Sequence, residues 1–271
     1  MKLKINYKKI FVTVLWIIAL SGLTASLAFV SKKESHVKAG SIDITVNATG
    51  ENQFVDEDDI KEFFNERQDI LLNAEVKNIN INALEKALNS HPAIENADLS
   101  VDVNGDIKIN VTQRTPLIRV LTMSGESYYI DTESKLMPLS DKYTARVLIV
   151  NGNIHEPYSR RYMFSVNQIA ENGIFKEVSL LDDIYEMANY ITNDTLLNSL
   201  IHQLSINEEK EFEMYPAIGN HKIIFGGATD IAEKFEKLKV FYKEGLNKTN
   251  NWNKYSTVNL KYKNQVVCTK K

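Results

Sequence analysis

The side chains that could do catalytic or metal chemistry are scattered along this sequence. Its five histidines do not form an H-E-x-x-H pair or another familiar zinc spacing. No serine lies in the G-x-S-x-G pattern of a nucleophile elbow. The pair Gly226-Gly227 lacks the spacing and the lysine of a phosphate-binding loop, so we interpret it as a turn into a helix. These residues therefore offer no candidate for serine-based acyl transfer, zinc hydrolysis or nucleotide binding.

Two acidic clusters could in principle hold a cation or act as the paired carboxylates of a glycoside hydrolase. The first, 56–59, precedes a predicted helix, where negative charge interacts favourably with the helix dipole. The second, 208–213, has the pattern of a solvated turn before a strand. The single cysteine, Cys268, excludes an internal disulfide and is predicted to lie in a strand. We predict no catalytic residues, no cofactor and no metal ion.

The composition is that of a folded protein, with 44% hydrophobic and 25% charged residues. The net charge of −3 does not favour nucleic-acid binding, because phosphate-binding surfaces normally carry a basic surplus. We therefore expect protein partners, with no nucleic acid and no small-molecule substrate.

A long apolar run lies near the amino terminus, at residues 10–30, and follows a short basic tail at 1–9. At about 1.5 Å per residue, a helix of this length covers the roughly 30 Å hydrocarbon core of a bilayer. The segment 26–28 resembles a signal-peptide cleavage site, but the apolar run is longer than the usual core of a signal peptide. We predict an uncleaved single-pass transmembrane helix at 10–30, a cytoplasmic amino terminus and a juxtamembrane linker at 31–40.

The region 41–115 has the pattern of a small α+β module. It opens with residues 41–47, which alternate between apolar and polar as in a half-buried strand. Asp56 is suited to cap the helix that follows, and a second helix begins near Asn82 and stops before Pro92.

The same module closes with two alternating segments within 97–111, which predict a hairpin. Asn104-Gly105 between them favours a type I′ turn. The order of elements is strand, helix, helix, strand, strand, which predicts a three-stranded sheet with both helices on one face.

The region 116–271 is richer in strands. Strands are predicted near 117–121, 128–130, 146–150, 201–206, 211–215, 222–225 and 257–269. One helix is predicted over 180–191, and another begins near Thr229 or Asp230 and ends at Gly245. The chain is thus predicted to be α+β, with a transmembrane helix, a βααββ module and a β-rich domain with a carboxy-terminal edge strand.

This arrangement resembles the FtsQ/DivIB family of bacterial cell-division proteins, in which a membrane span precedes a POTRA module and a β domain. Residues 81–97 are similar to the second POTRA helix and the strand after it. The segments Tyr128–Asp131 and Met137–Ser140 are similar to parts of the family's β domain. Residues 252–268 are similar to the Bacteroidetes branch in particular.

The resemblance implies a non-enzymatic scaffold of the divisome, in the cell inner membrane at the septum, with its carboxy-terminal domain in the periplasm. It implies FtsB-like and FtsL-like bitopic proteins as partners, and a POTRA module that recruits other divisome proteins. A strand of the FtsB-like partner would extend the last strands of the β domain, because an edge strand offers unpaired backbone donors and acceptors. A membrane-anchored extracytoplasmic cell-wall hydrolase is the alternative function.

The resemblance also implies partner-binding residues near the carboxyl terminus. The family's basic-aromatic pair on the terminal strand matches Lys261 and Tyr262. This chain has lysine where better-known members have arginine, and lysine cannot make the bidentate contacts of arginine. Lys261 could instead be a solvated edge charge and Tyr262 ordinary sheet packing. The expected partner-binding residues are Val258, Leu260, Lys261, Tyr262, Trp252 and Tyr255, although the last two could equally fill the core.

Overall fold

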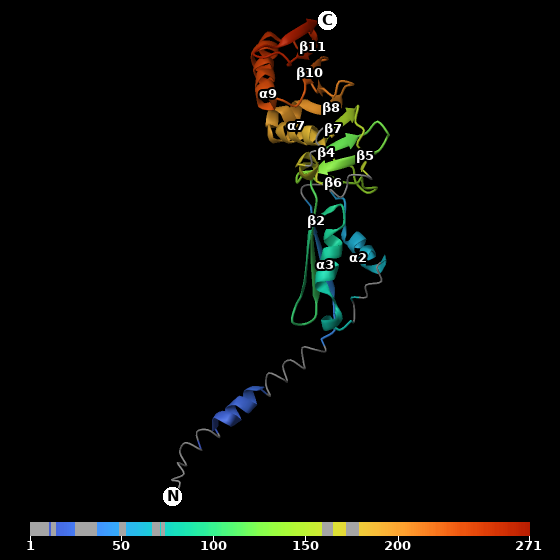
Figure 1. Cartoon of the computed structure of the whole chain (residues 1–271), viewed down its shortest axis with the longest axis vertical. Helices are drawn as coiled ribbons and strands as arrows, with labels where there is room; N and C mark the ends of the chain where they lie inside the picture. Colours follow the sequence, from blue (N-terminus) through green and yellow to red (C-terminus); the bar gives the residue numbers. More distant parts are fainter. Residues whose placement is uncertain are drawn as a thin grey trace. The chain divides into compact units, whose positions relative to one another are not determined.

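The computed structural model of the chain describes residues 11, 15–24, 37–48, 53–66, 71, 74–158, 165–171 and 179–271. These residues form two compact units (Figure 1). The first unit contains the chain up to Asn47, Asp56–Ser90 and Asn96–Val111. The second contains Ala48–Val55, His91–Glu95 and Thr112–Lys271. Together they give a mixed α+β fold, as predicted.

Residues 15–24 are helical and lie inside the predicted transmembrane segment 10–30. The rest of that segment, apart from Phe11, lies outside the described residues, as do the predicted cytoplasmic tail and most of the linker. Of the helices that the structure describes, none is both long enough and apolar enough to span a membrane.

The first unit has the predicted order of strand, helix, helix, strand, strand. Its elements are β1 (Ile42–Asn47), α2 (Glu57–Glu66), a short 3-10 helix (Val76–Asn78), α3 (Ile81–Asn89), β2 (Ile94–Val101) and β3 (Ile107–Gln113). The three strands form a sheet in the order β1-β3-β2. Alternate residues of β3 are buried, and α2 and α3 contribute Ile60, Phe64, Leu84 and Leu88 to the core of this unit.

Helix α2 begins with a reciprocal cap. The Asp56 Oδ1 accepts hydrogen bonds from the backbone N–H groups of Asp58 and Asp59, both at 3.0 Å. The Asp59 Oδ2 in turn accepts from the backbone N–H of Asp56, at 2.8 Å. The interpretation of the acidic cluster 56–59 as the start of a helix is therefore confirmed.

The hairpin of β2 and β3 is present, but its turn is not the predicted type I′ turn. The Asp102 side chain accepts hydrogen bonds from the backbone N–H groups of Asn104 and Asp106, and the Gly105 N–H donates to the Asp102 carbonyl. Gly105 has φ of 94°, whereas Asn104 is not among the described residues with positive φ, and a type I′ turn needs both. Val103 lies in the turn and is 93% exposed, so the predicted alternation stops before it.

The outer edge of β2 is closed at its centre by a side chain. The backbone N–H of Ala97 donates to the Asn89 Oδ1 at 2.8 Å, and the Asn89 Nδ2 donates to the Ala97 carbonyl at 3.1 Å. The amide of Asn89 therefore bonds Ala97 as a residue of a neighbouring strand would.

The second unit is built on one large mixed sheet, which the described residues form from nine strands. In spatial order these are β12 (Val267–Lys270), β11 (Tyr255–Asn259), β10 (Lys222–Gly226), β9 (Phe212–Pro216), β8 (Ile201–Ile206), β7 (Leu148–Gly152), β4 (Pro116–Leu121), β5 (Ser127–Asp131) and β6 (Leu136–Met137). Strands β4, β7 and β8 are parallel neighbours, β10 and β11 are parallel, and the other neighbours are antiparallel.

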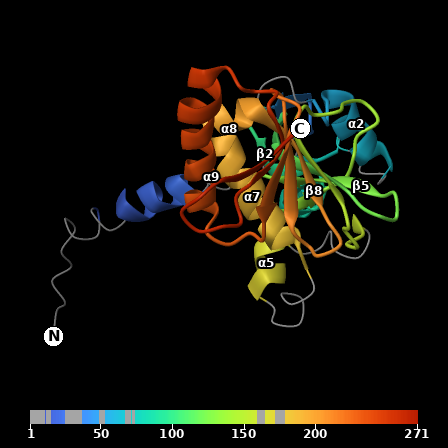
Figure 2. The same ribbon diagram turned by 90° about the horizontal axis from the view of Figure 1, so that it is seen from above.

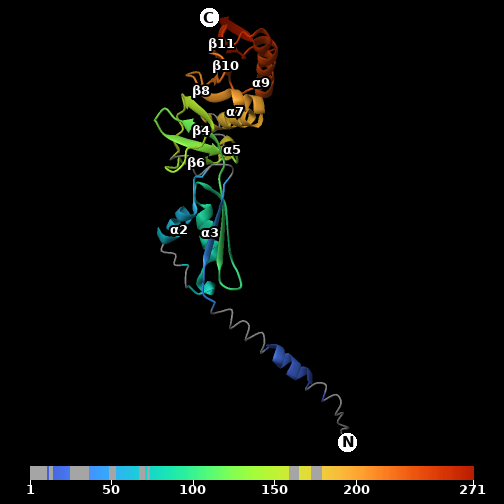
Figure 3. The ribbon, with the colours of Figure 1, turned by 180° about the vertical axis from the view of Figure 1, so that it is seen from behind.

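The main helices of this unit lie on the same side of the sheet, as Figures 2 and 3 show. They are α7 (Leu181–Asn193), α8 (Thr195–Leu200) and α9 (Ile231–Val240), and a short helix α5 (Val166–Glu171) precedes them. Their apolar faces and the inward residues of the strands form one core. Within it the ring of Phe235 stacks on Tyr190, with centroids 5.0 Å apart.

Helix α9 does not end at Gly245, as the sequence predicts. It continues as a π-helix over Phe241–Asn247. The Phe241 ring lies against Gly245, so close that a side chain there would meet the ring at 3.2 Å. Gly245 thus lets the Phe241 ring pack closely against the backbone inside the helix. It does not end the helix in a left-handed conformation.

Residues early in the sequence complete the core of the second unit. The Phe54 ring is buried and makes edge contacts with the rings of Tyr129 and Tyr143, each at a centroid distance of 5.5 Å. The Gln113 Oε1 accepts hydrogen bonds from the backbone N–H groups of Phe54 and Val55, at 2.9 and 3.1 Å. The second unit is therefore discontinuous in sequence.

Candidate functional site

Strand β12 forms one end of the large sheet and leaves one of its edges unpaired among the described residues. The Lys271 N–H donates to the Lys254 carbonyl at 3.2 Å, and the Ser256 hydroxyl donates to the Thr269 carbonyl. Thr269 and Lys271 thus direct backbone groups towards β11. Since backbone groups of a strand alternate in direction, those of Cys268 and Lys270 are directed to the open edge.

The charged residues of the last two strands and the segments beside them are all basic, and one of them, Lys261, is paired with Glu211. Residues 251–271 contain five lysines and no aspartate or glutamate. The rest of the chain must then be acidic, because the whole chain has a net charge of −3. A segment that pairs with β12 would therefore meet a positive field.

Two of the six expected partner-binding residues lie in the core. Val258 in β11 and Leu260 just after it are both fully buried. The Leu260 N–H donates to the Ile224 carbonyl of β10 at 2.9 Å, which extends the pairing of β11 with β10 by one residue. Their side chains therefore pack in the core of the second unit.

The expected basic-aromatic pair lies in the connection between β11 and β12, and not on the terminal strand. The Lys261 Nζ forms an ion pair with the Glu211 carboxylate at 2.6 Å, and its carbon stem lies over Gly226. The hydrogen bond to Glu211 raises the pKa of Lys261 above its ordinary value. Tyr262 is 49% exposed. The Lys261 side chain is therefore occupied by an ion pair within the chain, whereas the Tyr262 side chain is exposed at the surface.

Trp252 and Tyr255 are half-buried against the core. The Trp252 ring makes an edge contact with Tyr242 at 5.2 Å, and the Tyr255 ring lies 6.1 Å from Phe241. Both contacts are with the π-helix. Tyr255 is the first residue of β11 and Trp252 precedes it by three residues, and since both are only partly buried, packing and partner contact are compatible for them.

A lysine of α9 holds the connection between β11 and β12 in place. The Lys237 Nζ donates to the carbonyls of Leu260 and Tyr262, at 3.2 and 2.9 Å. One turn earlier, the buried Lys234 donates to the Gly227 carbonyl at 2.7 Å and lies over the Phe225 ring. No local sequence signal pointed to these lysines, because their acceptors are backbone groups of other elements.

A buried histidine joins the π-helix to the segment before β11. The His221 Nε2 lies 2.7 Å from the Tyr242 hydroxyl, whereas its buried Nδ1 has no hydrogen-bond partner among the described residues, with Gly219 and the Trp252 carbonyl nearby. Burial lowers the pKa of His221, although the Trp252 carbonyl opposes this change, and burial raises the pKa of Tyr242. The pair is therefore held neutral beneath the last two strands.

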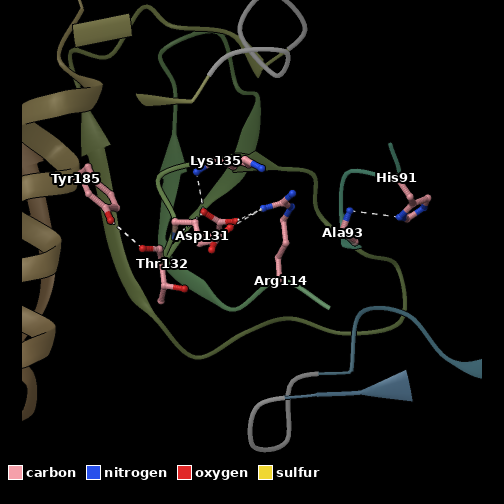
Figure 4. Close-up of polar contacts among 8 residues, drawn as sticks. His91, Ala93, Arg114, Asp131, Thr132, Lys135 and Tyr185 are labelled. Carbon is pink, nitrogen blue, oxygen red and sulfur yellow. Dashed lines mark hydrogen bonds and ion pairs between the residues drawn. The ribbon is translucent and has the colours of Figure 1, made fainter. Parts of the chain in front are cut away.

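A second polar cluster explains the motif Tyr128–Asp131 (Figure 4). The Arg114 Nη1 donates to the Asp131 Oδ2 at 2.7 Å, and both side chains are buried. The Asp131 Oδ1 accepts from the Lys135 N–H at 2.6 Å, while the Tyr185 hydroxyl donates to the Thr132 carbonyl. Both oxygens of the Asp131 carboxylate are thus occupied, and the cluster stabilises the turn after β5.

Within the described part of the chain, no group of three or more histidine, cysteine, aspartate or glutamate side chains is placed to hold a metal ion. Cys268 lies in β12, as predicted, and burial raises the pKa of its thiol, which disfavours the reactive thiolate.

A domain of POTRA type and a carboxy-terminal domain with a free sheet edge define a class of proteins that assemble with other proteins. Residues 38–112 match the family model of the POTRA-like domain. Residues 115–269, more than half of the chain, match the model described as FtsQ/DivIB, C-terminal related. The chain belongs to the FtsQ/DivIB family, whose members are membrane-associated, generally non-catalytic division proteins. No curated protein matches it.

Proposed function

We propose that this chain is a non-enzymatic divisome scaffold of the cell inner membrane, which binds FtsB-like and FtsL-like proteins with its last two strands. Its membership of the FtsQ/DivIB family supports a role in cell division. Residues 10–30 would anchor it, with the carboxy-terminal domain in the periplasm at the septum. The POTRA-like unit would recruit further divisome proteins.

The observation that carries this proposal is the open edge of β12. Its outward backbone groups at Cys268 and Lys270 can pair with an extended segment of the FtsB-like partner. The five lysines of residues 251–271 favour a partner segment with acidic side chains. Tyr262 supplies an exposed aromatic anchor beside the strand.

The test is co-purification of the full chain with the FtsB-like protein of the same cell. Lys270→Pro removes an outward N–H from the edge, so we expect affinity to fall about tenfold or more. Lys270→Ala removes the charge but keeps the N–H, and should lose much less. Equal retention of the partner by wild type and Lys270→Pro, with the fold checked by circular dichroism, would rule out strand addition at β12.

A second pair of variants tests the aromatic anchor. Tyr262→Asp should weaken the complex, because it removes an exposed ring and adds an acid where the partner carries acids. Tyr215→Asp is its matched control, since Tyr215 is similarly exposed, at 43%, but lies on β9 within the same sheet. If both variants bind alike, Tyr262 is not a contact.

A further inference from the structure

A cavity of about 520 Å³ opens at the amino-terminal ends of the three parallel strands β4, β7 and β8. Its apolar lining includes Leu117, Leu148 and Ile201, which are all buried. Its polar lining comes from Arg146 before β7, Thr192 at the end of α7, Asn198 of α8 and His202 of β8. The volume falls in the range of ordinary ligand pockets, about 300 to 1,000 Å³.

Three of the polar side chains are exposed to solvent at the mouth of the cavity. The side chains of Arg146, Asn198 and His202 form no hydrogen bond or ion pair with any residue that the structure describes. They present a guanidinium, a carboxamide and an imidazole around the same cavity. All three can donate hydrogen bonds, and a guanidinium offers its donors in the fork that fits a carboxylate.

The exposed guanidinium of Arg146 has no ion-pair partner among the described residues. Arg146 is the one charged residue in its described lining. The acid nearest in sequence to Thr192, Asp194, is already engaged, since its Oδ2 pairs with the Lys239 Nζ at 2.9 Å. Its Oδ1 accepts the N–H groups of Leu196 and Leu197 at the start of α8.

The end of α7 does not explain Arg146 either. A cation often complements the carbonyls at a helix carboxyl terminus. Among the described residues, no hydrogen bond joins the Arg146 guanidinium to the last carbonyls of α7.

We propose that this cavity binds a carboxylate joined to an apolar group, as in an acidic residue of an extended peptide. Arg146, assisted by Asn198 and His202, would hold the carboxylate at the rim, and the apolar part would contact the small exposed edges of Leu117, Leu148 and Ile201. The site lies at β4, β7 and β8 and does not include β11 or β12. It therefore stands or falls independently of strand addition at β12.

The probes are the peptide acetyl-Leu-Glu-amide, its isostere acetyl-Leu-Gln-amide, and free glutarate. Saturation-transfer NMR with the full chain should show the glutamate peptide binding about tenfold more tightly than the glutamine peptide. Arg146→Gln should abolish this preference, and Asn198→Ala should reduce it. Lys243→Gln is the control, because it removes one positive charge from an exposed position on the π-helix. It should leave the preference for the glutamate peptide unchanged.

Comparing glutarate with the glutamate peptide shows whether the carboxylate comes from a peptide or from a free small molecule. Weaker binding of glutarate than of the glutamate peptide supports a peptide ligand with an apolar neighbour, and equal binding supports a free small carboxylate. The proposal is overturned if wild type does not distinguish glutamate from glutamine, or if folded Arg146→Gln still does.

Discussion

At the scale of single residues, we expect His221 to make the stability of the second unit sensitive to acid. Its ring is buried between the Tyr242 hydroxyl and the Trp252 carbonyl, and Lys271 adds a further positive charge nearby. A proton on this ring would leave a buried charge close to the Trp252 carbonyl and the Tyr242 oxygen. Cys268, which faces Tyr242 from β12, becomes a thiolate only at high pH.

The sign of the pH effect follows from the lowered pKa of His221. In the unfolded chain the imidazole binds a proton as the pH falls through about 6.5, while in the folded chain it stays neutral to a lower pH. The unfolding free energy should therefore decrease between about pH 7.5 and about pH 5. Urea unfolding of the full chain, followed by tryptophan fluorescence, measures this change.

The matched variants separate His221 from the other titrating groups. His221→Gln can keep a hydrogen bond to Tyr242 and should show a smaller loss of unfolding free energy on acidification. His155→Gln changes a histidine at the surface, which contacts Asn153, and should behave as wild type. An unchanged pH slope in His221→Gln would contradict this assignment.

At the scale of elements, α9 positions the connection between β11 and β12 through Lys237. The lysine bonds two carbonyls of that connection, so its loss should loosen the segment without emptying the core. We expect Lys237→Met to speed hydrogen exchange at residues 260–263 and, if the proposed strand addition holds, to lower affinity for an FtsB-like protein. Lys243→Met, an exposed lysine of the π-helix, is the control, and equal exchange in both variants would exclude this role.

Local signals in the sequence were sufficient for most elements. The cap at Asp56, the alternation in β3 and the stop before Pro92 each depend on neighbours within a few residues, and all were predicted. The turn at Gly105 was assigned wrongly because the side chain of Asp102 supplies hydrogen bonds that favour a longer loop. The predicted helix end at Gly245 was wrong because the glycine makes room for the Phe241 ring within the helix.

The site was less predictable than the fold, because its contacts join residues that are distant in sequence. Lys261 was expected on the terminal strand, yet its position depends on Glu211, fifty residues earlier. The ion pair of Arg114 with Asp131 and the contact of His221 with Tyr242 likewise connect separate elements. Periodicity and capping carry no information about such pairs.

At the scale of the whole molecule, the second unit depends on a residue far from the rest of its sequence. Phe54 contributes a buried ring beside Tyr129 and Tyr143. We expect Phe54→Ala to lower the unfolding free energy of this unit by about 3 kcal/mol or more. Phe63→Ala, at a half-buried position of α2, should cost this unit much less. Calorimetry of the full chain gives both values, and equal effects would contradict the assignment of Phe54 to the second unit.

The discontinuity of the second unit also affects how deletion maps should be drawn. A fragment cut at residue 115, where the family match begins, lacks both Phe54 and Gln113. Such a fragment would expose Tyr129 and misfold more readily. A loss of partner binding could then be attributed wrongly to the absence of the POTRA-like domain. Swapping that domain while retaining residues 48–55, 91–95 and 112–115 would separate the loss of a partner contact from the loss of the fold.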